Sequence, residues 1–191
     1  MKKLLLILLC LPLLFTTCKK EDEEPENTNN NNSSSQIGDT HQGGIIFYLD
    51  GNGGGLIAAP SDQSTGAEWG CYGTEISGAD KTTFGAGAQN TIDIEAGCIT
   101  SGIAADICSN LNLGGYGDWF LPSRNELHEM GLNIGQGNSL GLGNIGSFSD
   151  NDYWSSTQSG DNWAWKQNFS NGSGTTSSKN NSKYVRAIRV F

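Results

Sequence analysis

The chain has 191 residues, enough for one ordinary domain plus tails, and 16% of them are charged. Its 20 Asp and Glu residues outnumber its 11 Lys and Arg residues, which gives a formal net charge of −9. Nucleic acid is therefore excluded as an expected partner, because binding to phosphates depends on clustered Lys and Arg. The negative charge also disfavours direct docking of a folded domain on anionic lipid.

Residues 1–17 have the pattern of a secretory signal peptide. Two lysines precede an apolar segment at 4–15, which is too short to span a membrane comfortably. The segment ends at Cys18 and resembles a bacterial lipoprotein signal, in which this cysteine is lipidated and becomes the mature N-terminus. The run KKEDEE at 19–24 resembles the acidic export signal of lipoproteins in Bacteroidetes-type bacteria, although such a run can also simply keep a linker extended. These resemblances imply a lipid anchor in the outer membrane and a protein that faces the cell exterior.

The segment that follows the cysteine is rich in Asn, Ser and Glu and contains no large apolar residue from 21 to 36. Such a composition cannot bury enough apolar surface to offset the entropy lost on ordering. The sequence therefore predicts a disordered tether over residues 18–36 and a folded domain over residues 37–191.

The first part of this domain predicts a hairpin, a long loop and a helix. The glycine-rich motif at 43–60 predicts a strand at 45–49 paired with one at 56–59. Residues 61–90 are rich in Gly, Ser, Thr and Ala and predict an irregular loop with short pieces of strand. Apolar residues at three- and four-residue spacing predict a helix over 101–113.

The densest local pattern in the chain is YGDWFLPSRNELHEM at 116–130. A short apolar run ends at Pro122, which favours an extended conformation at the residue before it. Ser123 followed three residues later by Glu126 forms a capping box, in which each side chain accepts a backbone N–H of the other residue. We expect a buried extended segment that turns sharply into a capped helix.

Three strands are predicted near the end of the chain, after a glycine-rich loop at 133–146. They cover residues 153–157, 162–169 and 184–191. In the second strand, the alternation of large aromatic residues predicts that Trp163, Trp165 and Phe169 point to one face.

Five features occur in a fixed order: a helix that carries a cysteine, then GGYGDWFLPSRNEL, YWSST, NWAW and YVRAIRVF. In this combination they resemble the DUF1566 family, which includes the C-terminal domain of a Legionella collagen-like adhesin and is grouped with C-type lectin-like folds. The resemblance covers roughly residues 43–191. It implies an α+β, C-type lectin-like domain, with two helices against a twisted antiparallel β-sheet, long loops, and the two chain ends as neighbouring strands.

The residues that carry this resemblance are interpreted as determinants of the fold. Buried Trp and Arg side chains with hydroxyl partners are more often scaffold than ligand contacts. These family landmarks are Trp119, Pro122, Glu126, Trp154, Ser155, Ser156, Arg186 and Arg189.

The predicted domain contains three cysteines, an odd number for an oxidising compartment. Many members of the resembled family pair the helix cysteine with one in the final strand, but here that position is Ala187. The helical rise places Cys98 too far from Cys108 for a bridge. Pairing of Cys71 with either Cys98 or Cys108 remains, and we favour Cys71–Cys98 with Cys108 as a small buried apolar residue.

Motifs of common enzymes are missing from the sequence. It has no nucleophile elbow, phosphate-binding loop or dinucleotide fingerprint. Its two histidines, His41 and His128, do not form a zinc motif. Formylglycine-generating enzymes have a related fold but need late cysteines, and none follows Cys108. We therefore expect a protein that is not an enzyme.

Two polar loops flank the predicted strand at 153–157 and lie where C-type lectin-like folds place ligand loops. Their carboxylate and amide oxygens can serve as calcium ligands, and a Trp can stack on a sugar face. However, the motifs EPN and WND of calcium lectins are missing, and the same residue types dominate ordinary solvated turns. The candidate ligand-binding residues are Asp150, Asp152, Asp161, Asn162, Trp163 and Trp165.

Together these observations predict a surface-anchored lipoprotein that recognises an extracellular ligand or mediates adhesion. Carbohydrate is the leading ligand class by analogy with the family, and no cofactor is expected apart from a candidate Ca²⁺. The expected partners are the membrane, through the lipid, and an extracellular glycan or protein. The alternative is a structural or protein-interaction module of the cell envelope without a small-molecule site.

Overall fold

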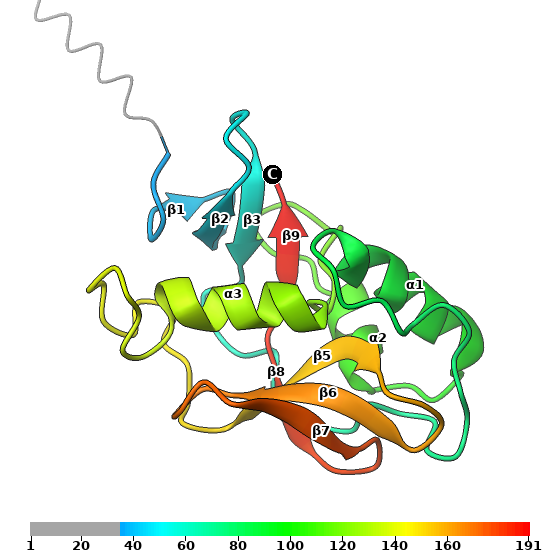
Figure 1. Ribbon diagram of the computed structural model, residues 1–191. Coiled ribbons are helices and arrows are strands. Elements are labelled where there is room, and N and C mark those ends of the chain that lie inside the picture. Colours follow the sequence, from blue (N-terminus) through cyan, green and yellow to red (C-terminus); the bar gives the residue numbers. More distant parts are fainter. Residues whose placement is uncertain (1–34) are drawn as a thin grey trace, which may run out of the picture. The chain divides into compact units, whose positions relative to one another are not determined.

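The computed structural model describes residues 35–191, which form three helices and nine strands (Figure 1). The predicted signal peptide (1–17), the lipidation site Cys18 and almost all of the predicted tether (18–36) lie outside the described residues. None of the helices in the described part of the chain has the length and apolar character needed to cross a membrane.

The first sheet brings the two ends of the domain together. Its strands follow the order β1-β2-β3-β9, and every neighbouring pair is antiparallel. The predicted hairpin is confirmed as β2 and β3, with Ile46 opposite Ile57. The last strand of the chain then pairs with β3, as the family resemblance implied. The bounds are β1 Thr40–His41, β2 Gly44–Leu49, β3 Gly55–Ala58 and β9 Ile188–Val190.

The second sheet follows the order β4-β8-β5-β6-β7. All its pairs are antiparallel except β5 with β8, which run parallel with Tyr153 opposite Tyr184. The predicted strands at 153–157 and 162–169 correspond to β5 and β6. The bounds are β4 Ser64–Ala67, β5 Asp152–Gln158, β6 Trp163–Asn168, β7 Gly174–Ser178 and β8 Lys183–Val185.

The predicted strand at 184–191 is divided between the two sheets, because the chain leaves β8 at Arg186 and enters β9 at Ile188. At the crossing, the buried Arg186 guanidinium donates to the carboxylate of Asp62 and to the carbonyl oxygens of Ala59 and Gly146. A single β-prone segment of the sequence thus contains a change of sheet at a buried arginine.

Helix α3, Arg124–Ile134, lies between the two sheets and contacts β2, β5 and β6 (Figure 1). The capping box is confirmed. The backbone N–H of Glu126 donates to the Ser123 hydroxyl, and the Ser123 N–H donates to the Glu126 carboxylate at 2.7 Å. Burial raises the pKa of Glu126, although hydrogen bonds from the backbone of Ser123 and Gly85 oppose this rise.

The other two helices differ from the sequence prediction. Helix α2, Ala104–Ser109, covers only the middle of the predicted 101–113. Helix α1, Ala86–Gly97, lies mostly outside any predicted helix and begins in the segment predicted as a loop. Its buried face contains one large apolar side chain, Ile94, while the rest of that face is small or polar. It therefore lacks the apolar stripe by which helices are recognised in a sequence.

The α+β class is confirmed, and the C-type lectin-like assignment is compatible with this arrangement. The structure differs in detail, with three helices and two sheets in place of two helices against one sheet. Two buried clusters hold it together, one around Trp69, Trp119 and Trp154 and the other around Phe47 and Tyr153. All eight family landmarks are buried.

The disulfide is the one favoured from the sequence. Cys71 is bonded to Cys98, with 5.7 Å between their Cα atoms, and Cys108 is free and buried. Cys98 lies at the end of α1, so the bond ties the loop after β4 to this helix. Burial raises the pKa of the Cys108 thiol, which keeps it neutral.

Candidate functional site

The turn between β5 and β6 carries two of the candidate residues, Asp161 and Asn162, and the disulfide loop lies beside it. The Gly73 N–H donates to the carbonyl oxygen of Asp161 at 3.2 Å, and the Asn162 amide donates to the Asp161 carboxylate at 3.0 Å. Trp163 follows with 50% of its surface exposed, and the neighbouring loop exposes 56% of Tyr72. Two large aromatic side chains thus stand in solvent on adjacent loops, next to a carboxylate and an amide.

A buried lysine supports this turn from below. The Lys179 Nζ donates to the carbonyl oxygen of Thr74 at 2.8 Å and to the Gln158 Oε1 at 2.9 Å, and it lies 4.4 Å from the centroid of the Trp69 ring. Burial lowers the pKa of Lys179 to about 8, although the negative charge of Asp161 opposes the shift. Lys179 therefore links the disulfide loop to the end of β5.

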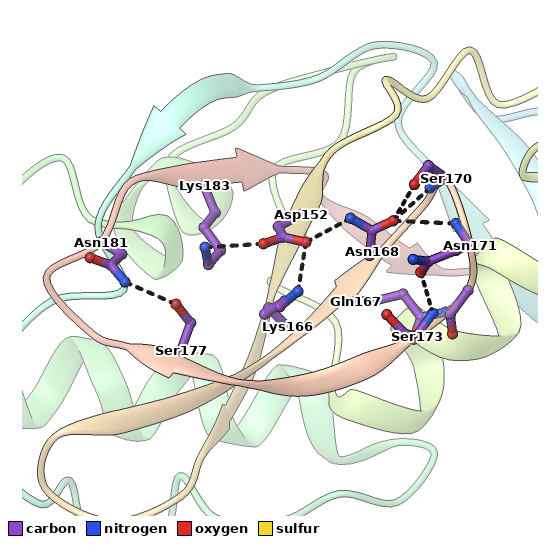
Figure 2. Close-up of polar contacts among 11 residues, drawn as sticks. Asp152, Lys166, Gln167, Asn168, Ser170, Asn171, Ser173, Ser177, Asn181 and Lys183 are labelled. Atoms are coloured by element: carbon purple, nitrogen blue, oxygen red, sulfur yellow. Dashed lines mark hydrogen bonds and ion pairs between the residues drawn. The ribbon is translucent and has the colours of Figure 1, made fainter.

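The polar cluster at the start of β5 is internally satisfied (Figure 2). Asp152 Oδ1 accepts from Lys166 at 2.7 Å and from Asn168 at 2.9 Å, while Oδ2 accepts from Lys183 at 3.2 Å. Burial opposes the ionisation of Asp152, but the bonds from Lys166, Asn168 and Lys183 outweigh it and lower the pKa of this carboxyl. Both oxygens of Asp152 are thus occupied, whereas Asp150 is exposed two residues earlier.

The four predicted calcium ligands are divided between the two ends of β5. Asp150 and Asp152 lie at its start, while Asp161 and Asn162 lie in the turn after its end. At about 3.3 Å per residue, the strand alone separates the two pairs by roughly 20 Å. Across residues 35–191, no group of three or more His, Cys, Asp or Glu side chains is arranged to hold a metal ion.

The two tryptophans of β6 lie on the same face of the sheet. Trp163 is paired with Ser178 of β7 and Trp165 with Thr176, in a regular register. The Arg124 guanidinium of α3 stacks on Trp165, 3.7 Å from the ring centroid. The third residue of the predicted alternation, Phe169, lies after the end of β6 and is buried in the second core cluster.

Two adjacent hollows lie between α3 and β6, and they were not predicted from the sequence. One of about 150 Å³ lies beside Arg124 and His128, and one of about 300 Å³ lies between the end of α3 and the β6–β7 turn. Gln167 and Gly172 line both. Tyr72 was also missed, because its loop reaches the β5–β6 turn through tertiary contacts, including the bond from the Gly73 N–H to the Asp161 carbonyl oxygen.

Comparison with known families identifies the domain. Residues 59–189 match the family described as the Lcl C-terminal domain, while no curated protein matches the chain. The match covers well over half of the chain and includes β4 to β8, all three helices and both candidate loops. The chain therefore belongs to the family of Lcl C-terminal domains, an adhesion-type domain of surface proteins.

Proposed function

We propose that this protein is a lipid-anchored adhesin of the outer membrane that binds an extracellular carbohydrate. The binding surface consists of Tyr72, Asp161, Asn162 and Trp163, which we call the Trp163 surface. The observation that carries the proposal is the half-exposed Trp163 at the start of β6, next to a loop that exposes Tyr72. The Gly73 N–H of this loop donates to the Asp161 carbonyl oxygen, and Lys179 donates to the Thr74 carbonyl oxygen.

Exposed tryptophan is costly to leave in water, and its flat apolar face is suited to the C–H face of a sugar ring. The carboxylate of Asp161 and the amide of Asn162 can accept and donate hydrogen bonds to sugar hydroxyls next to that ring. An apolar face with a few polar groups at its edge is the usual composition of a small-molecule site.

The anchor is proposed on Cys18, which follows the apolar segment at 4–15. A lipid at this cysteine would hold the domain near the outer membrane, through the tether at 18–36 that the sequence predicts. The net charge of −9 favours attachment through the lipid over adsorption of the folded domain to anionic lipid.

Recognition is proposed to be independent of calcium. Asp152 is occupied by two lysines, and Asp150 lies at the opposite end of β5 from Asp161. Binding measured with calcium and with chelator should therefore be equal. Loss of binding on chelation would contradict this part of the proposal.

A glycan array probed with residues 35–191 tests the Trp163 surface, since this segment contains both core clusters and the disulfide. Replacing Trp163→Ala should lower the affinity about tenfold or more, the equivalent of roughly 1.4 kcal/mol. Asp161→Asn should also weaken binding, whereas the matched control Asp150→Asn should not. An array without any bound glycan would reject the proposal.

A second candidate function has its own supporting observation. Between Glu129 and Asp150 the chain carries no charge, and this stretch exposes Leu140, Leu142 and Ile145 on a glycine-rich loop. Exposed aliphatic side chains on such a loop fit contact with another envelope protein. Cross-linking from position 140 to an envelope protein, lost in Leu140→Asp, would favour this function if the glycan array stays blank.

A further inference from the structure

Two adjacent hollows lie between α3 and the β6–β7 hairpin, on the face of β6 that also carries Trp163, and we call them together the groove. One wall is the outer edge of α3, where Arg124, His128 and Leu132 are spaced four residues apart and all exposed. Residues at this spacing form a single ridge along a helix. The far end of the groove is closed by the β6–β7 turn, which includes Asn171 and Gly172.

The floor of the groove is one face of β6. Gln167 follows Trp163 and Trp165 at two-residue spacing, and the regular register places Gly174 of β7 opposite Gln167. Alternate residues of a strand point to the same face, so the three side chains form a row. Because Gly174 has no side chain, the row remains uncovered at this point.

Gln167 has a buried side chain with a free acceptor. Only 5% of its surface is exposed, and its Nε2 donates to the Gly172 carbonyl at 3.1 Å and lies 3.3 Å from the His128 Nδ1. Both of these contacts are made by Nε2, so the Gln167 Oε1 is left without a hydrogen-bond donor among residues 35–191 and is open to solvent. Both hollows border this side chain, so the free oxygen has space for a ligand donor.

The larger hollow contains no charged side chain. Its lining combines amides, hydroxyls and glycines with the apolar Leu132 and Phe169. At the turn, the Asn168 Oδ1 accepts from the Ser170 and Asn171 N–H groups, which fixes the rim (Figure 2). Arg124 is the only Lys, Arg, Asp or Glu that lines either hollow.

The length of the groove indicates a ligand of several units. From Trp163 to Gln167, the strand rises about 13 Å, and from Arg124 to Leu132 the helix rises about 12 Å. The larger hollow extends further, to residues 136–139 and to the β6–β7 turn. A single sugar at Trp163 would leave Gln167 and this hollow unoccupied.

We propose that the groove is an extended subsite for an uncharged polysaccharide. It holds several consecutive sugars of the chain, and the sugar that precedes them stacks on Trp163. This inference rests on the proposed carbohydrate binding and specifies its ligand. Sugar hydroxyls donate to the Gln167 Oε1 and accept from Arg124, while Leu132 covers an apolar sugar face. A polyanionic chain fits less well, because the larger hollow lacks charge and the protein has a net charge of −9.

Affinity as a function of ligand length tests the groove. The probes are neutral gluco-, xylo-, manno- and galacto-oligosaccharides from dimer to hexamer, titrated calorimetrically against the full chain in detergent. We expect affinity to increase at least tenfold from dimer to hexamer for the series that binds. A length-independent affinity would overturn the groove but leave the Trp163 surface intact.

Gly174→Leu should remove this gain. A Cβ at Gly174 would lie 3.5 Å from the Gln167 Oε1 and 3.9 Å from the Lys166 carbonyl oxygen, which are ordinary contacts, so the longer side chain fills the groove without backbone strain. The hexamer should then bind like the dimer. The matched control is Gly66→Leu on β4, where the added Cβ would meet only Ser182 at 3.8 Å.

Two further outcomes separate the proposals. Trp163→Ala should weaken the binding of dimer and hexamer alike. If Trp163→Ala abolishes all binding but Gly174→Leu still binds the hexamer like the wild type, the result supports the Trp163 surface and rejects the groove. Preference for acidic over neutral hexamers rejects the ligand class. Leu132→Lys, at an exposed helix position, provides a second block if Gly174→Leu does not fold, and it should reduce hexamer binding without affecting the dimer.

Discussion

Strand β6 has two faces of opposite character. On one face, Lys166 and Asn168 both donate to Asp152, and Lys183 completes the same cluster (Figure 2). On the other face, Trp163 is half exposed and the Gln167 Oε1 faces open space. Polar groups that satisfy one another hold strands together but have little left to offer a ligand. The contrast is the reason to interpret the first face as scaffold and to propose the second as the recognition surface.

Two arginines provide the sharpest form of this comparison, since both stack on an aromatic ring. Arg186 lies over Phe148 at 4.2 Å and is 1% exposed, whereas Arg124 lies over Trp165 and is exposed. Arg186→Met should destabilise the protein by roughly 3–5 kcal/mol, because Asp62 loses its buried partner. Arg124→Met should cost less than about 1 kcal/mol but weaken glycan binding. Urea unfolding and glycan titration of both variants measure the two effects.

The opposite results would contradict a structural role for Arg186 and a binding role for Arg124. If Arg186→Met folded with wild-type stability, the buried contacts of Arg186 with Asp62 and the two carbonyls would not be structural. If Arg124→Met bound oligosaccharide like the wild type, Arg124 would not be a hydrogen-bond donor to the ligand.

The disulfide is expected to give the next largest effect, and it acts on the recognition side. Its cysteines are 27 residues apart, and closing such a loop stabilises a fold by about 3.5 kcal/mol. Replacing both Cys71 and Cys98 by Ser should therefore lower the unfolding free energy by roughly this amount and also weaken binding at Tyr72. Cys108→Ala, a change at the free buried thiol, should cost about 1 kcal/mol and leave binding unchanged. Equal effects in the two variants would mean that the bond does not support the loop.

Lys179 is a buried residue of the scaffold next to the Trp163 surface, where it donates to Thr74 and Gln158. Lys179→Met leaves the Thr74 carbonyl without its donor and leaves the Gln158 Oε1 with the Ile76 N–H alone, so we expect a loss of roughly 1–3 kcal/mol at neutral pH. The pKa of Lys179 is about 8 in the folded protein and about 10.4 when unfolded, so the unfolded state holds the proton longer. Stability should therefore rise with pH between these values.

Urea titrations across this pH range, compared between wild type and Lys179→Met, measure this rise. It should be missing in the variant, while Lys81→Met at an exposed site should retain it. If the stability of Lys179→Met still rises with pH, another titratable group causes the rise.

Local chemistry made part of this fold predictable from the sequence. The capping box at Ser123, the hairpin of β2 and β3, and the Cys71–Cys98 bond each depend on short-range patterns or simple distance limits. Helix α1 escaped prediction because its buried face is mostly Ala, Gly, Asn and Thr, so no apolar periodicity marks it. The β-prone segment before the C-terminus likewise gave no sign that the chain changes sheets at Arg186.

Only part of the proposed recognition surface could be predicted from the sequence, for a similar reason. The alternation around Trp163 and Trp165 was apparent in the sequence, and the four-residue spacing of Arg124, His128 and Leu132 was there to be found. What the sequence does not contain is their juxtaposition, since α3 and β6 are brought together by packing. A sequence search can look for exposed residues at four-residue spacing on a helix together with aromatic residues at two-residue spacing on a strand, provided that the two elements are known to be neighbours.

The smallest predicted effect lies on the satisfied face of β6. Asp152→Asn removes the charge that pairs with Lys166 and Lys183, and because the site is partly exposed we expect a loss of about 1 kcal/mol at neutral pH. The folded pKa of Asp152 lies below its unfolded value of about 3.9, so its contribution is complete above roughly pH 4 and is lost as the pH falls through the folded pKa. Urea midpoints of wild type and Asp152→Asn should therefore converge in acid.

Asp150→Asn is the control for this titration, because Asp150 is exposed and forms no ion pair with residues 35–191. It should follow the wild type at every pH. Asp152→Asn should also leave oligosaccharide affinity unchanged, since Asp152 pairs with Lys166 and Asn168 on the face of β6 opposite Trp163 and Gln167. Weaker binding in Asp152→Asn with normal binding in Trp163→Ala would reverse the assignment of the two faces and move the recognition surface to the lysine cluster.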